Sequence, residues 1–192
     1  LSPWGTHLSS EEYEPDAHNL AGEDDGKFLD FSKALYGDQN KANPYHYGHM
    51  PEVFVNPDGT GFVKKHYNLG RISHELIQMM PDERTALMGD DTTNGGLFMF
   101  VADKPRDLSS GHLYVAKVKQ TSAKGMGTGE FTTQWIHLGH ATSNEIEAMA
   151  NTFKPEDIMS VKYQDPKDPS YTKIYFGGKP NWVKLNSKNK HA

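Results

Sequence analysis

From residue 52 onward, short apolar runs alternate with clusters of turn-forming residues. Val53-Phe54-Val55 and Phe62-Val63 flank an Asn-Pro-Asp-Gly stretch, which predicts a β-hairpin over 53–67. Six more runs share this β-prone composition and are bounded by Gly, Pro, Asp or Asn: 85–88, 97–101, 112–118, 134–138, 158–163 and 172–176. Short strands separated by turn signals predict an all-β domain, built as a sandwich, a barrel or a propeller.

One segment has helical rather than strand spacing. Its apolar side chains repeat with the period of an α-helix: Ile146, Met149, Ala150 and Phe153. This repeat predicts one short helix near 143–153. Thr142 lies three residues before Glu145, which is the spacing of a capping box, and Pro155 is expected to end the helix.

Residues 1–50 show scattered acidic side chains among Gly and Asn and little regular pattern. We therefore expect an irregular acidic segment over 1–50 and a strand-rich part over 51–192. Compact domains keep long irregular segments mainly for function, and a solvated acidic loop is the alternative interpretation.

Composition narrows the class of protein. The 192 residues have a low apolar content of 35 % and a mean hydropathy of −0.73, but nine Tyr, nine Phe and three Trp argue against disorder. The net charge of −5 and the lack of a basic block argue against a nucleic-acid-binding surface. Apolar runs are also too short for the roughly 18–20 residues of a membrane span.

The chain has no cysteine, which excludes disulfides, zinc thiolates, iron–sulfur clusters and a cysteine nucleophile. Its ten histidines and its acidic excess instead favour chemistry with cations or phosphate, although many such histidines lie on protein surfaces without a ligand.

Acidic pairs are the first candidates for chemistry. Four of them lie at the edges of strand-like runs or in tight loops: Glu11-Glu12, His74-Glu75, Asp90-Asp91 and Glu156-Asp157. Hard cations such as Ca²⁺ gather carboxylate and carbonyl oxygens from loops. The pairs do not have EF-hand spacing, so a metal site must be assembled in space, and solvated turns are the alternative.

The segment Gly70–Glu75 is the second candidate. It carries a guanidinium, a hydroxyl, an imidazole and a carboxylate within six residues. Arg71 could hold a phosphate through two parallel hydrogen bonds. In an extended chain Arg71 and Glu75 share one face, so the two side chains could also simply pair with each other.

Five motifs then occur in a fixed order along the chain. They are Pro3-Trp4-Gly5-Thr6 followed by Glu11-Glu12, Leu69-Gly70-Arg71 with His74-Glu75, Met88-Gly89-Asp90-Asp91, Gly111 with Leu113-Tyr114-Val115-Ala116-Lys117, and Lys154-Pro155-Glu156-Asp157. In this order, from residue 3 to about 163, the chain resembles the PhoX-type alkaline phosphatases. The resemblance implies a six-bladed β-propeller, of which residues 1–192 would form a partial domain covering about half of the ring. Another segment or chain would complete it.

The resemblance also implies an active centre that combines Fe³⁺ and Ca²⁺ ions. The implied metal ligands are carboxylates: Glu156, Glu75, Glu11, Asp90, Asp91 and Glu52. Lys154 and Arg71 are the implied catalytic, phosphate-binding side chains. Ser10 stands where the family has an iron-binding cysteine, and a neutral hydroxyl is a poor ligand, so Ca²⁺ is favoured over Fe³⁺. Lys154 replaces an arginine and loses the bidentate fork.

The expected function is hydrolysis of a small phosphomonoester by a metal-dependent phosphoesterase, with a periplasmic or extracellular location implied by the resemblance. The Ser10 and Lys154 departures favour an alternative, a non-catalytic propeller module that binds Ca²⁺ for stability or holds a partner. A β-sandwich without metal is a third possibility.

Overall fold

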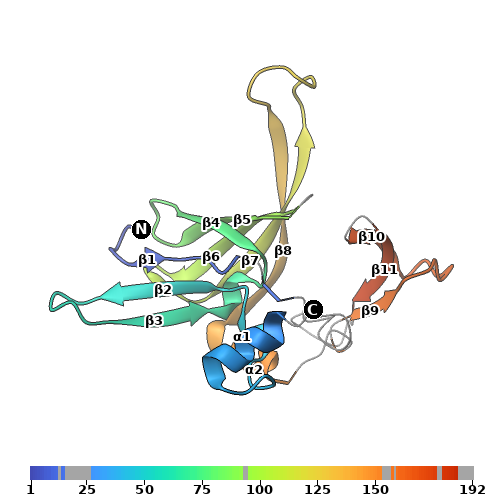
Figure 1. The fold of residues 1–192 in the computed structure, drawn as a ribbon. Coiled ribbons are helices and arrows are strands. Elements are labelled where there is room, and N and C mark those ends of the chain that lie inside the picture. The colour runs from blue at the N-terminus through green and yellow to red at the C-terminus, as the bar shows by residue number, and fades with distance from the viewer. Residues whose placement is uncertain are drawn as a thin grey trace.

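The structure is a computed structural model that describes residues 1–12, 14–15, 27–92, 95–152, 157, 159–176 and 179–185. Its strands form three antiparallel sheets, which confirms the all-β class (Figure 1). The first sheet has the order β1-β2-β3, with β1 at His7–Leu8, β2 at Met50–Val55 and β3 at Gly61–His66. β2 and β3 form the predicted hairpin around the Pro-Asp-Gly turn.

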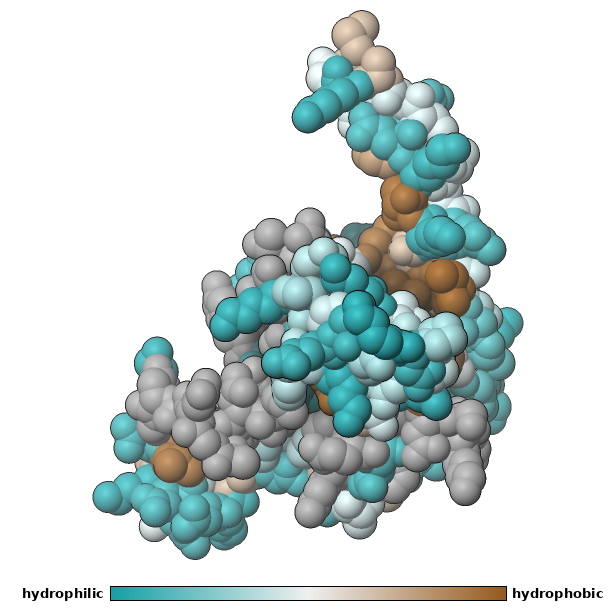
Figure 2. Space-filling view, turned by 90° about the vertical axis from the view of Figure 1, so that its right-hand side faces the viewer, coloured by the Kyte–Doolittle hydropathy of each residue, from teal (hydrophilic) through white to brown (hydrophobic). Residues whose placement is uncertain are grey.

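The central sheet is a five-stranded meander in which each strand pairs with the next along the chain. Its strands are β4 (His74–Met79), β5 (Thr85–Asp90), β6 (Leu97–Lys104), β7 (Asp107–Gln120) and β8 (Phe131–Thr142). β7 and β8 are the longest strands, and their far halves project from the sheet as an arm (Figure 1). Apolar surface gathers where this arm meets the sheet (Figure 2).

The third sheet follows later in the chain and has the order β10-β11-β9. Its strands are β9 (Met159–Lys162), β10 (Thr172–Phe176) and β11 (Lys179–Leu185). The part of the chain that the structure describes therefore forms three separate sheets and no closed ring.

In the described part of the chain, two α-helices and two single turns of 3-10 helix accompany the sheets. They are α1 (Lys27–Tyr36), η2 (Pro44–His46), η3 (Tyr67–Leu69) and α2 (Ser143–Ala150). Among the described residues, neither helix is long and apolar enough to cross a membrane.

Helix α1 lies within the segment that the sequence predicted to be irregular. The rings of Phe28 and Phe31 pack against Tyr47, with ring centroids 5.9 and 5.3 Å apart. Gly37 ends the helix in the left-handed region, with a φ of 73°, and its amide donates to the carbonyl of Lys33. Aromatic packing against Tyr47 thus stabilises a helix that the local sequence pattern does not predict.

Helix α2 confirms the predicted helix and its capping box. The hydroxyl of Thr142 accepts from the amide of Glu145, and the Glu145 carboxylate accepts from the amide of Thr142. The helix ends at Ala150; Phe153 and Pro155 lie outside the described residues.

Loss of this cap gives a first prediction. Thr142→Ala is expected to lower the free energy of unfolding by about 1 kcal/mol, because the amide of Glu145 loses its acceptor. Urea denaturation followed by circular dichroism measures the change. Asn144→Ala, at an exposed position in the same turn, is the control and should leave stability within about 0.5 kcal/mol. Equal effects of the two variants would contradict the role of the cap.

The core lies between the first sheet and the central sheet. Its buried apolar residues come from both sheets and from the connections: Leu8, Met50, Leu69, Met79, Ala86, Met88, Phe100, Ala102 and Leu108. Gly111 permits close packing in this core, since a Cβ there would lie 2.5 Å from the ring of Phe100. This shared core fixes the N-terminal segment, which carries the first acidic pair, against the central sheet.

Candidate metal centre

Glu11 joins the first sheet to the central sheet. Its amide donates to the carbonyl of His49 over 3.2 Å, and its carbonyl accepts from the amide of His74 over 3.3 Å. Its carboxylate accepts from the amide of His49 at 2.9 Å and forms an ion pair with Lys65 at 2.6 Å. These four contacts fix the backbone at Glu11 and therefore the position of its neighbour, Glu12.

A β-bulge sets the direction of Glu75. His74 pairs with Asp90 and Leu76 pairs with Gly89, which leaves Glu75 as the extra residue of β4. His74 is fully buried, whereas Glu75 is exposed. Bulges commonly redirect a side chain in this way. The amide of Asp91 also donates to the carbonyl of Ser73 at 2.9 Å, which holds the loop after β5 beside the start of β4.

These constraints bring three carboxylates together. One oxygen from each of Glu12, Glu75 and Asp91 lies within 4.8 Å of the others, and all three residues are exposed. We call this group the carboxylate cluster. It contains one residue from each of three motifs that are far apart in the sequence, Glu11-Glu12, His74-Glu75 and Asp90-Asp91. Its all-oxygen donor set suits a hard cation such as Ca²⁺.

Electrostatics in the cluster favour a bound cation. The pKa of Glu75 is raised above its ordinary value, chiefly by the charge of Asp91, then by a hydrogen bond with Asp91, and also by Glu12. A cation placed among the three carboxylates would relieve this repulsion. The donor set therefore fits the metal ion that the sequence led us to expect.

The pKa of Glu75 gives a second prediction. Asp91→Asn should move this pKa back toward 4.5, because the charge of Asp91 is the largest cause of the shift. In the wild type the folded state binds the extra proton, so this group makes stability fall as pH rises through the window above 4.5. An NMR pH titration of the Glu75 carboxyl carbon, with chelator present, measures the shift. Glu130→Gln is the control, and an unchanged pKa in Asp91→Asn would contradict the assigned cause.

The buried neighbour of Glu75 remains neutral. Nε2 of His74 lies 3.1 Å from the carbonyl oxygen of Gly70, so this nitrogen carries the proton and donates. Burial lowers the pKa of His74. Within the described ranges its Nδ1 has no hydrogen-bond partner, so its lone pair is unused. His74 thus adds an acceptor nitrogen and no positive charge to this part of the chain.

Asp90 and Glu11, two other predicted metal ligands, have different surroundings. Asp90 is half-buried, and its carboxylate accepts from the hydroxyl of Thr92 at 3.3 Å. Glu11 is engaged by Lys65, whereas Glu12, which the sequence reasoning did not choose, joins the cluster. Alternation could have revealed this, since adjacent residues of an extended chain point to opposite sides.

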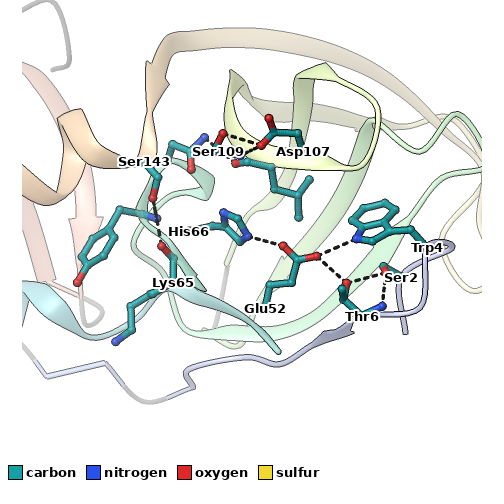
Figure 3. Close-up of polar contacts among 12 residues, drawn as sticks. Ser2, Trp4, Thr6, Glu52, Lys65, His66, Asp107, Ser109 and Ser143 are labelled. Carbon is teal, nitrogen blue, oxygen red and sulfur yellow. Dashed lines mark hydrogen bonds and ion pairs between the residues drawn. The ribbon is translucent and has the colours of Figure 1, made fainter. Parts of the chain in front are cut away.

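Glu52 lies in a buried polar network rather than in the cluster (Figure 3). It is 2 % exposed, and its Oε1 accepts from Nε1 of Trp4 at 2.8 Å and from the hydroxyl of Thr6 at 2.6 Å. Its Oε2 lies 2.7 Å from Nε2 of His66. Burial raises the pKa of Glu52, but the hydrogen bonds from His66, Thr6 and Trp4 outweigh burial, so the net shift is downward. In this arrangement Glu52, on β2, joins the segment that precedes β1 to His66 at the end of β3.

Arg71 is likewise engaged by the protein. Its guanidinium donates to the carbonyls of Tyr47, Pro44 and Pro15, and it lies over the ring of Tyr45. Arg71 thereby fixes the loop that precedes β2. Lys154 and Glu156 lie outside the described residues. Ser10 is exposed and directly precedes Glu11, so the first acidic pair has a hydroxyl where the resemblance expects a thiolate.

These features define an all-β protein in which exposed carboxylates from three separate segments converge. The chain belongs to the PhoX alkaline phosphatase family, whose model matches residues 1–190. No curated protein and no solved structure matches the chain. The family is one of metal-dependent phosphatases, and the carboxylate cluster gives this chain a group of residues able to bind metal.

Proposed function

We propose that the protein hydrolyses phosphomonoesters with the help of Ca²⁺ held by the carboxylate cluster. The observation that carries this proposal is the convergence of Glu12, Glu75 and Asp91 within 4.8 Å, in a chain that belongs to a phosphatase family. Each of the three residues comes from a motif that the family resemblance singled out. The convergence is therefore what a shared metal site requires.

The cluster supplies the ligands in this proposal. Glu12, Glu75 and Asp91 bind the ion, with Asp90 and Glu156 as further carboxylates for an ion that takes six to eight oxygens. When bound, Ca²⁺ would polarise a phosphoryl oxygen and stabilise negative charge as the ester bond breaks. Fe³⁺ is a less suitable occupant, because Ser10 offers no thiolate.

The cationic side chains have separate roles. Lys154 contacts the phosphate in this proposal, as a single point charge rather than as a bidentate fork. Arg71 is a positioning residue, because its Nε and Nη2 donate to backbone carbonyls. It holds the loop before β2, and that loop leads to the amide of His49 that fixes Glu11.

We further propose that the three sheets belong to a six-bladed propeller that another segment or chain completes, and that the protein acts in the periplasm or outside the cell. The family assignment supports both statements. Small-angle scattering of the full protein tests the propeller, since a closed ring predicts a compact disc.

A phosphatase assay tests the proposed activity. The full protein, stripped with chelator and then supplied with Ca²⁺ or Fe³⁺, is given a chromogenic phosphomonoester. We expect hydrolysis to disappear on stripping and to return with Ca²⁺. Absence of turnover in the metal-replete protein would refute the enzymatic proposal.

The departures at Ser10 and Lys154 favour a second function, a calcium-binding module without catalysis. It predicts that Ca²⁺ raises the Tm, because an ion that binds only the folded state stabilises it, while the assay shows no turnover. The two measurements together distinguish the two functions.

A further inference from the structure

Histidines gather on the outer face of the central sheet, away from the carboxylate cluster. His112 on β7 pairs directly with His140 on β8, and Val101 on β6 pairs with His112 from the other side. Directly opposed residues of an antiparallel pair project from the same face. The strand register shifts between Ala102 and Lys104, and the carboxylate of Asp103 reaches the same face, where it contacts His140.

A β-bulge adds a third histidine to this face. Leu113 pairs with Gly139, but Tyr114 pairs with His137, so Leu138 is the extra residue of β8. In a regular strand, His137 and His140 would point to opposite faces because they are three residues apart. The extra residue places both on the same face.

The side chains of Asp103, His112, His137 and His140 contact one another through hydrogen bonds and ring contacts. Nε2 of His140 lies 2.9 Å from Oδ2 of Asp103, which also accepts from the hydroxyl of Ser110 at 2.6 Å. Nδ1 of His112 lies 3.0 Å from Nε2 of His137, and the rings of His112 and His140 are 4.5 Å apart. One ligand atom from each of Asp103, His112 and His140 lies within 4.8 Å of the others.

We propose that Asp103, His112 and His140 bind a divalent transition-metal ion, with Zn²⁺ as the best match. Two imidazoles and one carboxylate form a donor set that Zn²⁺ accepts readily and that Ca²⁺, which prefers oxygen, does not. Asp103 and His140 are 39 % and 42 % exposed at the side chain, so an ion can enter from solvent and keep a water ligand.

His137 orients His112 in this site. Metal-binding histidines usually have their second ring nitrogen hydrogen-bonded to a partner that fixes the tautomer and the ring orientation. The contact between His112 and His137 is such a hydrogen bond. The metal ion would link β6, β7 and β8 within the central sheet.

The zinc site is separate from the carboxylate cluster. Asp103 lies at the end of β6, whereas Leu97, at its start, pairs with Gly89 beside Asp90. Six residues of strand, or about 20 Å, separate the two ends. The two sites can therefore be tested independently.

Calorimetric titration with Zn²⁺, in the presence of saturating Ca²⁺, tests the proposal on the full chain. The wild type should bind one equivalent of Zn²⁺ that His112→Ala and His140→Ala both lose. His137→Ala should bind it about tenfold more weakly. His7→Ala, at an exposed position on β1, is the matched control and should bind as the wild type does. Co²⁺ in place of Zn²⁺ should give visible absorption bands that the same two variants lose.

A wild type that binds no Zn²⁺ under these conditions would overturn the zinc site. An equal stoichiometry in the wild type, His112→Ala and His140→Ala would overturn it too. Loss of Zn²⁺ in Glu75→Gln/Asp91→Asn instead would assign the ion to the carboxylate cluster and also refute the proposal. Circular dichroism shows whether each variant folds, and Zn²⁺ should raise the Tm of the wild type but not that of His140→Ala.

Discussion

Replacing Glu52 by alanine is expected to lower the free energy of unfolding by about 3–5 kcal/mol, because it removes a buried acceptor shared by three side chains. Trp4, Thr6 and His66 all direct a polar atom at this carboxylate. Without it, Nε1 of Trp4 and Nε2 of His66 lose this partner, whereas the Thr6 hydroxyl keeps its contact with the Ser2 hydroxyl at 2.7 Å. Each buried polar atom that is left unpaired costs about 1–3 kcal/mol. Urea denaturation monitored by tryptophan fluorescence measures the change.

Glu52→Gln is the matched comparison, since it keeps the shape of the side chain and one carbonyl oxygen. It should cost less than Glu52→Ala, because only the charge-assisted part of the hydrogen bonds is lost. Both variants should leave Ca²⁺ binding intact, provided that they fold, because Glu52 lies in the buried network. A Glu52→Ala cost below about 1 kcal/mol would contradict the role of this network.

The buried network around Glu52 also makes the stability of the fold depend on pH. The folded-state pKa of Glu52 is lowered from 4.5, so its contribution to stability is present above 4.5 and is lost as pH falls through the folded pKa. Glu52→Gln should lack this part of the acid dependence.

Glu75→Gln/Asp91→Asn is expected to abolish the Ca²⁺-dependent rise in Tm and to reduce phosphomonoester hydrolysis at least about 100-fold. Loss of two of the three clustered carboxylates leaves too few charged oxygens to hold a hard cation. Removal of the ion also removes the charge that stabilises the transition state, a contribution of several kcal/mol, and about 1.4 kcal/mol corresponds to a factor of ten.

The control for this double variant is Glu130→Gln/Glu147→Gln, which makes the same change in net charge at two exposed positions outside the cluster. It should keep both the Ca²⁺ response and the activity. Without metal, Glu75→Gln/Asp91→Asn should be at least as stable as the wild type, since the repulsion that raises the pKa of Glu75 is gone. Loss of the fold would also remove the Ca²⁺-dependent rise in Tm, so the circular dichroism spectrum of the variant is compared with that of the wild type.

Sequence patterns predicted the parts of the fold that local chemistry determines. The β2–β3 hairpin follows from its Pro-Asp-Gly turn, and α2 follows from its apolar spacing and capping box. Strands β4 and β11 are not among the predicted runs. Strand β11 contains Pro180, a residue that disfavours strands, yet it is the central strand of its sheet. Proline lies near the start of β11, where one missing amide is tolerated.

The candidate site was predicted less completely, because bulges and long-range contacts decide it. The sequence singled out Glu75 and Asp91 but chose Glu11, whose carboxylate pairs with Lys65. The bulges at Glu75 and Leu138 shift strand register by one residue and so change which side chains share a face. Pattern alone does not reveal such shifts, which is why the histidines could be counted in the sequence but not placed together.

Calorimetric titration of the metal-stripped full protein with Ca²⁺ tests directly whether the carboxylate cluster binds metal. We expect the wild type and Glu130→Gln/Glu147→Gln to bind Ca²⁺ with the same stoichiometry and Glu75→Gln/Asp91→Asn to lose at least one equivalent. An equal number of bound Ca²⁺ ions in all three proteins would contradict a metal site at Glu12, Glu75 and Asp91.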